Sequence, residues 1–249
     1  MTIAMQDGLP EKLLQMACSV PAKRLTKLSF DGADYYVKTP ERHRNFRMRL
    51  QKGNPAAAFR RETLLLDAFL ARGAPVPEIV ARDDNHIILA DQGLPVHQLQ
   101  CEGRADATVL AKVGAALAEL HSKGLTHGRP SLRDICWDGV RITFLDLEAG
   151  ARLQAGPKQK ARDLILLLNS AMVVDTSAPK VATLLLEAYL AHADRSVWCA
   201  TWSLAHRLWW LDVLATPFAR RDQRRGKLRS EFRAIKQTRQ LILSHPRPA

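Results

Sequence analysis

The chain has 249 residues, of which 47% are hydrophobic, and this is enough to bury a sizeable core as one domain or as two coupled lobes. It contains no run of about 18 apolar residues, which argues against a transmembrane helix, and its four cysteines lack the paired spacing of a zinc site or a disulfide framework. The formal net charge of +12, with arginines concentrated in residues 42–52 and 220–239, predicts an anionic partner: a nucleotide, a nucleic acid, a phosphorylated sugar or a membrane surface.

The first part of the chain is predicted to contain strands and one long helix. In order, we expect a short helix over 10–17, two strands within 23–39, a helix over 55–72, and two strands at 78–81 and 86–90. Asp31-Gly32 between β-prone residues predicts a hairpin turn. Pro55 and Gly73 are typical of the start and the end of a helix.

The second part is predicted to be mainly helical. We expect helices over 108–123, 158–170, 178–193 and 197–214, followed by a basic helical segment over 220–243. Between the first two helices, residues 127–148 read HGRPSLRDICWDGVRITFLDLE: a loop led by His127, a hairpin with Asp138-Gly139 at its tip, and a strand over 142–145 that ends on Asp146. Strands followed by helices, without a βαβ repeat, indicate an α+β plan with two lobes.

Several short motifs, in this order, resemble those of one known group. They are Tyr-Tyr-Val-Lys ending at Lys38, Arg-Arg-Glu ending at Glu62, Ala-Pro-Val-Pro at 74–77, His127-Gly128, Leu-Asp-Leu-Glu at 145–148, and Arg-Asp-Leu around Asp163. Together they resemble the protein-kinase-like fold, and more narrowly the bacterial lipopolysaccharide-core kinases that phosphorylate Kdo or heptose. The resemblance implies a single kinase-like domain over 1–249. Its N-lobe, at about 20–95, would be a small, mainly antiparallel sheet with one helix, and its C-lobe, over 96–249, a larger helical part with a basic helical C-terminal segment.

The resemblance also implies roles for individual residues. Lys38, held by Glu62, would contact the phosphates of ATP, and Asp134 and Asp146 would ligate Mg2+, a hard cation that prefers oxygen ligands. A buried Asp163 would orient the loop that begins at His127 through hydrogen bonds from the loop backbone. The alternatives are an exposed strand-end lysine at 38, a helix-surface acid at 62, and a first-turn carboxylate at 163 that favours the helix dipole.

Two positions depart from the family pattern. The family loop reads His, any residue, Asp, four residues and then Asn. Here the same register gives His127, Arg129 and Asp134, which together with Asp146 are the catalytic residues that the resemblance implies, and Arg129 occupies the position of the catalytic Asp. An arginine cannot accept a proton at neutral pH. In addition, Gly32 is the only glycine in the first predicted hairpin, whereas kinases have a glycine-rich loop over the ATP phosphates.

Two functions therefore stay open. One is ATP- and Mg2+-dependent phosphotransfer to a sugar hydroxyl of a glycolipid such as lipopolysaccharide core, with Arg129 contacting the substrate. The other is a pseudokinase that binds a nucleotide or a partner and regulates it. A nucleic-acid partner is not expected, since no RNA-binding or helix-turn-helix signature is present.

The location is predicted from the ends of the chain. The N-terminus lacks the basic and apolar segments of a secretory signal, which predicts a cytoplasmic protein. Near the C-terminus, the predicted helix over 197–214 carries Trp198, Trp202, Trp209 and Trp210 and precedes the second arginine group. Such a segment is either a buried helix of the helical lobe or a peripheral contact with the anionic inner membrane.

Overall fold

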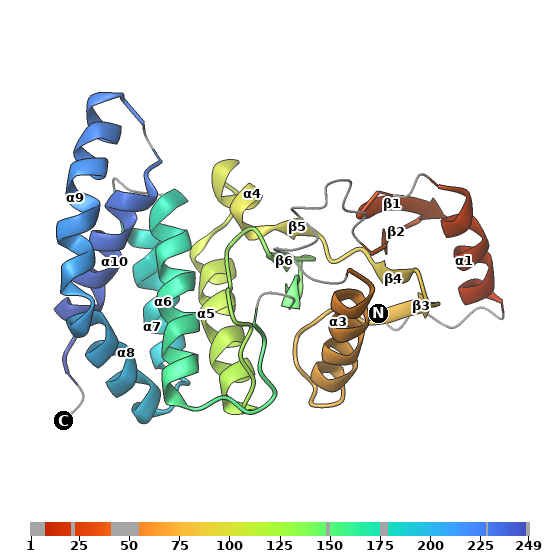
Figure 1. Cartoon of the computed structure of the whole chain (residues 1–249), viewed down its shortest axis with the longest axis horizontal. Helices are drawn as coiled ribbons and strands as arrows, with labels where there is room; N and C mark the ends of the chain where they lie inside the picture. The colour runs from red at the N-terminus through yellow and green to blue at the C-terminus, as the bar shows by residue number, and fades with distance from the viewer. Residues whose placement is uncertain are drawn as a thin grey trace. The chain divides into compact units, whose positions relative to one another are not determined.

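The structure is a computed structural model that describes residues 8–20, 23–40, 55–147, 150–174, 179–227 and 229–247. The arginine group at 42–52 and Glu148 lie outside these residues. The chain divides into two compact units (Figure 1): the first contains the chain up to Leu70 together with Val76–Gln92, and the second contains Ala71–Pro75 together with the chain from Gly93 onward.

The first unit is built on a four-stranded antiparallel sheet with the order β1-β2-β4-β3. Its strands are β1 (Leu25–Phe30), β2 (Ala33–Lys38), β3 (Ile79–Arg82) and β4 (Ile87–Ala90). The predicted turn between β1 and β2 is confirmed: Asp31 has φ 50° and Gly32 has φ 74°. Positive φ at both central residues matches the right-handed twist of the two strands, as in a type I′ turn.

Two helices accompany this sheet, α1 (Leu9–Ser19) and α3 (Pro55–Leu70), and they correspond to the helices expected over 10–17 and 55–72. Leu13 of α1 packs in one hydrophobic cluster with Tyr35 and Val37 of β2. Because side chains alternate between the two faces of a strand, Lys38 points to the face opposite α1. This alternation sets Lys38 apart from the hydrophobic cluster.

The second unit holds a small three-stranded sheet and most of the helices (Figure 1). The sheet has the order β5-β6-β7, with β5 (Leu94–Pro95), β6 (Ile135–Trp137) and β7 (Ile142–Phe144). The helices are α4 (Val96–Cys101), α5 (Ala107–Ser122), α6 (Pro157–Val174), α7 (Lys180–Leu190), α8 (Arg195–Arg207), α9 (Trp209–Arg224) and α10 (Glu231–Ser244). Helix α5 packs closely on α7 because Gly114 has no side chain: a Cβ there would lie 2.4 Å from the backbone oxygen of Leu185.

The expectation of one helix over 197–214 is wrong, because the chain breaks at Leu208 into α8 and α9. Arg239 of α10 stabilises the break. Its guanidinium donates to the Ala205 carbonyl near the end of α8 at 3.0 Å and pairs with Asp212 in the first turn of α9 at 2.9 Å. The basic segment after 220 is also divided, since Gly226, with φ 65°, follows the end of α9, and Ser230 caps α10.

None of the described helices combines the length and the apolar composition that a membrane span requires.

Candidate active site

The hairpin of β6 and β7 brings two carboxylates to one end. Ile135 of β6 is paired with Phe144 of β7, and the Leu145 N–H continues this pairing by donating to the Asp134 carbonyl at 2.7 Å. Asp134 therefore immediately precedes β6, and Asp146 follows β7 at the same end of the hairpin. The carboxylate at 134 is half-buried and the one at 146 is exposed.

Asp146 has an unusual backbone conformation. Its φ is 61°, and among the described residues other than glycine only Asp31, in the β1–β2 turn, also has a positive φ. A non-glycine residue in the left-handed region costs about 1–2 kcal/mol. Strain of this kind is concentrated at functional sites, where the surrounding structure holds it in place.

The pKa of the Asp134 carboxyl is affected by the nearby carboxylate of Asp146. Burial raises the pKa of the Asp134 carboxyl above its usual value, and the negative charge of Asp146 raises it further, while His127, Ser131 and Arg129 act in the opposite direction. Two neighbouring carboxylates repel each other unless a cation lies between or beside them. Oxygen donors of this type suit Mg2+, so the donor set fits the metal that the family resemblance implies here.

His127 leads the loop and is buried. Its Nε2–H donates to the Leu145 carbonyl at 2.6 Å, and its ring lies tilted against Phe144 at 5.8 Å between centroids. The ring therefore fixes the backbone just before Asp146. This geometry makes His127 a positioning residue for the carboxylate.

Helix α6 holds the same loop through two side chains. Asp163, which is 1% exposed, accepts the N–H groups of His127 at 2.7 Å and of Gly128 at 3.0 Å. Seven residues further along the helix, Ser170 accepts the Leu132 N–H at 3.1 Å. Because α6 begins at Pro157, Asp163 is beyond the first turn, and the alternative of a first-turn dipole acid does not apply. Sequence reasoning identified Asp163 and missed Ser170.

Asp163 is itself contacted by His121, which in turn bonds to Tyr189, and neither contact was predicted from the sequence. His121, at the end of α5, places Nε2 3.5 Å from an Asp163 oxygen and Nδ1 2.7 Å from the Tyr189 hydroxyl. Burial lowers the pKa of His121, and the Asp163 carboxylate opposes that shift. His121 and Tyr189 thus connect α5 and α7 to the acid that holds the loop.

Gly128 allows the loop to pass close to the chain beyond the hairpin. Its φ is 93°, and a Cβ at this position would lie 2.4 Å from the carbonyl carbon of Gly150 and 2.7 Å from the Ala151 nitrogen. Both contacts are with backbone atoms, which cannot turn aside as a flexible side chain can. The two residues are therefore needed for different reasons: His127 for the hydrogen bond of its ring to Leu145, and Gly128 because no side chain fits there.

The first unit contributes a buried ion pair between Lys38 and Glu62. Glu62 lies on the same face of α3 as the buried Phe59 and Phe69 and is only 4% exposed, while the Lys38 side chain is 12% exposed. Neither residue is the exposed surface group that the alternative interpretations required. A charge that is buried in this way needs a partner, so each residue fixes the position of the other.

Several cations lie near the loop in the second unit. Arg129 is exposed, and its positive charge acts on the Asp134 carboxyl. Burial lowers the pKa of His97 at the start of α4, and the positive charges of Arg133 and Arg229 lower it further. The backbone of His97 is joined to the loop, since its N–H donates to the Leu132 carbonyl at 2.8 Å.

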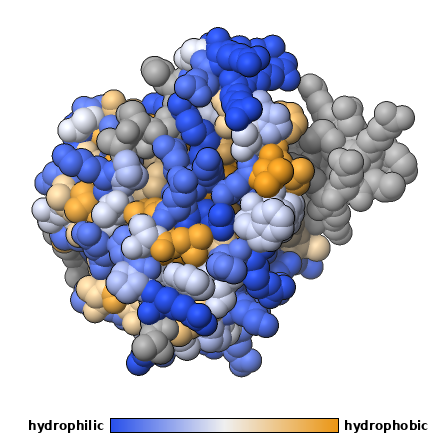
Figure 2. Space-filling model, turned by 90° about the vertical axis from the view of Figure 1, so that its left-hand side faces the viewer, coloured by the Kyte–Doolittle hydropathy of each residue, from blue (hydrophilic) through white to orange (hydrophobic). Residues whose placement is uncertain are grey.

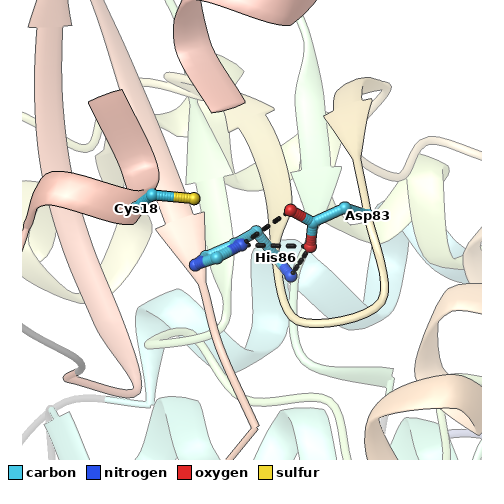
Figure 3. A group of neighbouring side chains, drawn as sticks. All are labelled: Cys18, Asp83 and His86. Carbon is cyan, nitrogen blue, oxygen red and sulfur yellow. Dashed lines mark hydrogen bonds and ion pairs between the residues drawn. The ribbon is translucent and has the colours of Figure 1, made fainter. Parts of the chain in front are cut away.

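A separate cluster in the first unit consists of Cys18, Asp83 and His86 (Figure 3). The Asp83 carboxylate accepts the backbone N–H groups of Asn85 and His86, both at 2.7 Å, and lies 3.0 Å from His86 Nδ1. These hydrogen bonds are those of an Asx-turn between β3 and β4. They account for the position of both residues without a metal ion.

One protein family matches more than half of the chain. Residues 20–189 match the model of the lipopolysaccharide kinase (Kdo/WaaP) family. An uncharacterized protein of Haemophilus influenzae is 29% identical over 220 residues, which cover 85% of this chain and 89% of that protein. The residues matched by the family model include every predicted site residue from Lys38 to Asp163.

Similar solved structures have low sequence identity. The structure of a gentamicin–APH(2")-IIa complex is 12% identical with a TM-score of 0.48, and the match covers 99% of each chain. A divergent kinase that lacks the glycine-rich loop and regulates membrane ultrastructure of the Toxoplasma parasitophorous vacuole is 14% identical with a TM-score of 0.43. That match covers 76% of this chain and 81% of the other.

Proposed function

The chain belongs to the lipopolysaccharide kinase (Kdo/WaaP) family and has the two-lobed, kinase-like α+β fold, and on this basis we propose that it transfers the γ-phosphate of ATP to a sugar hydroxyl of a glycolipid such as lipopolysaccharide core. The observation that carries the proposal is the pair of carboxylates, Asp134 and Asp146, at one end of the β6–β7 hairpin. Burial and mutual repulsion raise the pKa of the first carboxyl, as expected of a pair suited to a divalent cation.

Each residue of the proposed site has a distinct task. Lys38, oriented by Glu62, binds the phosphates of ATP. Asp134 and Asp146 would hold Mg2+, which would supply positive charge beside the phosphates of ATP. His127 and Asp163 do not touch the substrate; they keep the loop in the conformation in which the two carboxylates are adjacent.

With Arg129 at this position the site lacks a general base for the acceptor hydroxyl, but phosphate transfer does not require one. The transition state of phosphoryl transfer is loose, so positioning and charge stabilisation provide most of the catalysis. A general base adds about 10²- to 10⁴-fold. Without one, we expect slow transfer, with the exposed Arg129 contacting an anionic acceptor.

Further positive charge favours an anionic acceptor. Arg133 lies in the loop next to Asp134, and Arg229 precedes α10; both lower the pKa of His97 through their charge. These cations would bind a carboxylate or a phosphate of the sugar. A glycolipid acceptor would also place the protein, cytoplasmic by expectation, at the surface of the inner membrane.

The second candidate is a pseudokinase that binds a nucleotide or a partner without turnover. It is favoured by Arg129 at the position of the catalytic Asp and by the presence of Gly32 alone in the β1–β2 hairpin. A pseudokinase that binds a nucleotide would use the same nucleotide site and would differ in not transferring phosphate.

The test is transfer of label from γ-labelled ATP, with Mg2+, to lipopolysaccharide-core glycolipids. Wild-type protein should label the acceptor, Asp146→Ala should abolish labelling, and Glu187→Ala, an exposed acid on α7, should leave it unchanged. Arg129→Asp should raise the rate by restoring a base. Binding of ATP with no transfer by the wild-type protein or by Arg129→Asp would favour the pseudokinase.

A further inference from the structure

Helix α9 exposes an apolar face. Of the large hydrophobic residues that are exposed in the described chain, five lie on this one helix: Trp209 at 61%, Trp210 at 45%, Val213 at 62%, Leu214 at 58% and Phe218 at 48%. Figure 2 shows this side of the molecule, where hydrophobic and strongly hydrophilic surfaces lie next to each other. Large apolar side chains that are exposed together on one helix are a recurrent sign of a binding surface.

The other face of α9 is the one that packs against the rest of the second unit. Helix α9 packs mainly against α10, and the residues that it buries there are Ala215 and Asp222. A helix normally turns its large apolar side chains toward the core. Here a small residue and an acid are buried while two tryptophans are exposed, and Phe218, at the edge of the apolar face, stacks on Phe232 of α10 at 4.9 Å between ring centroids.

Four arginines continue the exposed face toward the C-terminal end of the helix. Arg220, Arg221, Arg224 and Arg225, together with Pro217, line an open hollow of about 400 Å³. At 3.6 residues per turn these arginines share the half of the helix that carries the apolar side chains. The exposed face is therefore apolar in its first half and cationic in its second.

The acids of α9 do not neutralise this face. Asp212 is paired with Arg239 of α10, and Asp222 accepts from the Ser230 hydroxyl at 2.8 Å and pairs with Lys227 at 3.1 Å. Both carboxylates are thus engaged on the side of the helix that packs on the protein. The positive charge of the arginine group is left to attract an anionic partner.

We propose that α9 docks the protein onto the surface of an anionic lipid bilayer. Trp209, Trp210, Val213 and Leu214 enter the boundary between headgroups and acyl chains, and the arginines contact lipid phosphates. The arginines are complementary in charge to the phosphates of such a surface, whereas a parallel contact with a second copy would bring two arginine groups together. The inference deepens the proposed function by identifying the surface that holds the protein at its glycolipid acceptor.

The experiment is co-sedimentation of the full chain with vesicles. Binding should be strong to phosphatidylethanolamine vesicles that contain phosphatidylglycerol and weak to vesicles of phosphatidylcholine alone. Arg220→Gln/Arg224→Gln should weaken binding about 25-fold at low salt, because each arginine near an anionic surface contributes roughly fivefold. The matched control is Arg60→Gln, an exposed arginine on α3, which should have no effect.

The apolar contribution is tested separately. Val213→Ser/Leu214→Ser should weaken binding at least about tenfold at any salt concentration, whereas Leu64→Ser, which alters a 69% exposed leucine on α3, should not. Trp209→Phe/Trp210→Phe should remove the quenching of tryptophan fluorescence by brominated lipids. All of these positions are exposed, so circular dichroism should show unchanged folding.

Two results would overturn the inference. One is vesicle binding that the α9 variants leave unchanged. The other is absence of vesicle binding together with a concentration-dependent dimer that the α9 variants dissociate, which would assign the face to a second copy. Because vesicle binding is measured without ATP or acceptor, its failure is distinct from a failure of phosphotransfer, and the reverse also holds.

Discussion

Replacement of Asp163 by alanine should strongly destabilise the second unit. The side chain is 1% exposed and accepts the N–H groups of His127 and Gly128 at 2.7 and 3.0 Å. Alanine would leave both donors buried without this acceptor. A hydrogen bond to a charged group contributes about 1.5–3 kcal/mol, so we expect a loss of about 3–6 kcal/mol. The total free energy of unfolding of a domain is only about 5–15 kcal/mol.

The assay is urea unfolding followed by tryptophan fluorescence. All five tryptophans of the chain lie in the second unit, so the signal reports the unit that contains Asp163. Ser170→Ala removes one neutral acceptor and should cost about 1 kcal/mol. Asp194→Ala is the matched control, because this acid caps the N-terminus of α8 at an exposed site; its loss should also cost about 1 kcal/mol.

The reasoning would be refuted if Asp163→Ala lost no more stability than Asp194→Ala. Such a result would mean that the loop backbone finds other acceptors readily, so that α6 does not hold it. A large loss for Asp163→Ala with a small loss for Ser170→Ala would support the account.

Three further predictions concern the two halves of the proposed site. Gly128→Ala should destabilise the chain by clearly more than Gly139→Ala, because both have positive φ but only Gly128 would place a Cβ against backbone; equal melting-temperature losses would contradict this. The pKa of the Asp134 carboxyl is raised in the folded state, so stability falls as pH rises between the unfolded and folded pKa values. Asp134→Asn should therefore melt at a higher temperature than wild type at neutral pH, with the difference vanishing below a pH of about 3.9, and a less stable variant at neutral pH would contradict the raised pKa. Lys38→Met should cost about 3–5 kcal/mol by leaving the buried Glu62 without its lysine. Lys38→Met/Glu62→Leu should recover most of that loss in urea unfolding followed by far-UV circular dichroism, without recovering ATP binding, and no recovery would argue against a purely local pair.

The proximity of Asp134 and Asp146 could be predicted from the sequence of the hairpin alone. The Asp138-Gly139 turn and the apolar strand after it predict a hairpin, and any hairpin brings the residues just outside its two strands together. Asp134 and Asp146 are such residues, so their proximity could be expected without knowledge of the rest of the fold. The left-handed conformation of Asp146 could not, since aspartate rarely adopts it and nothing nearby in the sequence requires it.

The support of the loop depends on distant contacts. Ser170 lies 38 residues from Leu132, and His121 lies 42 residues from Asp163. Serine and histidine are ordinary residues in helices, and their sequence neighbours give no sign of what they will contact. Asp163 was identified only because a known family places an acid there.

The exposed face of α9 shows another limit of sequence patterns. Helical periodicity indicates which side chains share a face, but it does not indicate whether another element covers that face. Trp198 and Trp210 look alike in the sequence, yet the first is buried on α8 and the second is exposed on α9. The break at Leu208 separates them, and Arg239, which is 31 residues from the break, bonds to residues on both sides of it.

Magnesium-dependent binding of ATP tests the central claim most directly, because the claim is that Asp134 and Asp146 form a metal–nucleotide site. The measurement is isothermal titration of ATP into the wild-type protein and into Asp146→Asn, each with and without Mg2+. The account predicts that Mg2+ strengthens ATP binding to the wild-type protein and has little effect on the variant, while Glu187→Gln behaves as wild type. Equal enhancement by Mg2+ in the wild-type protein and in Asp146→Asn, or no binding of ATP under any condition, would contradict it.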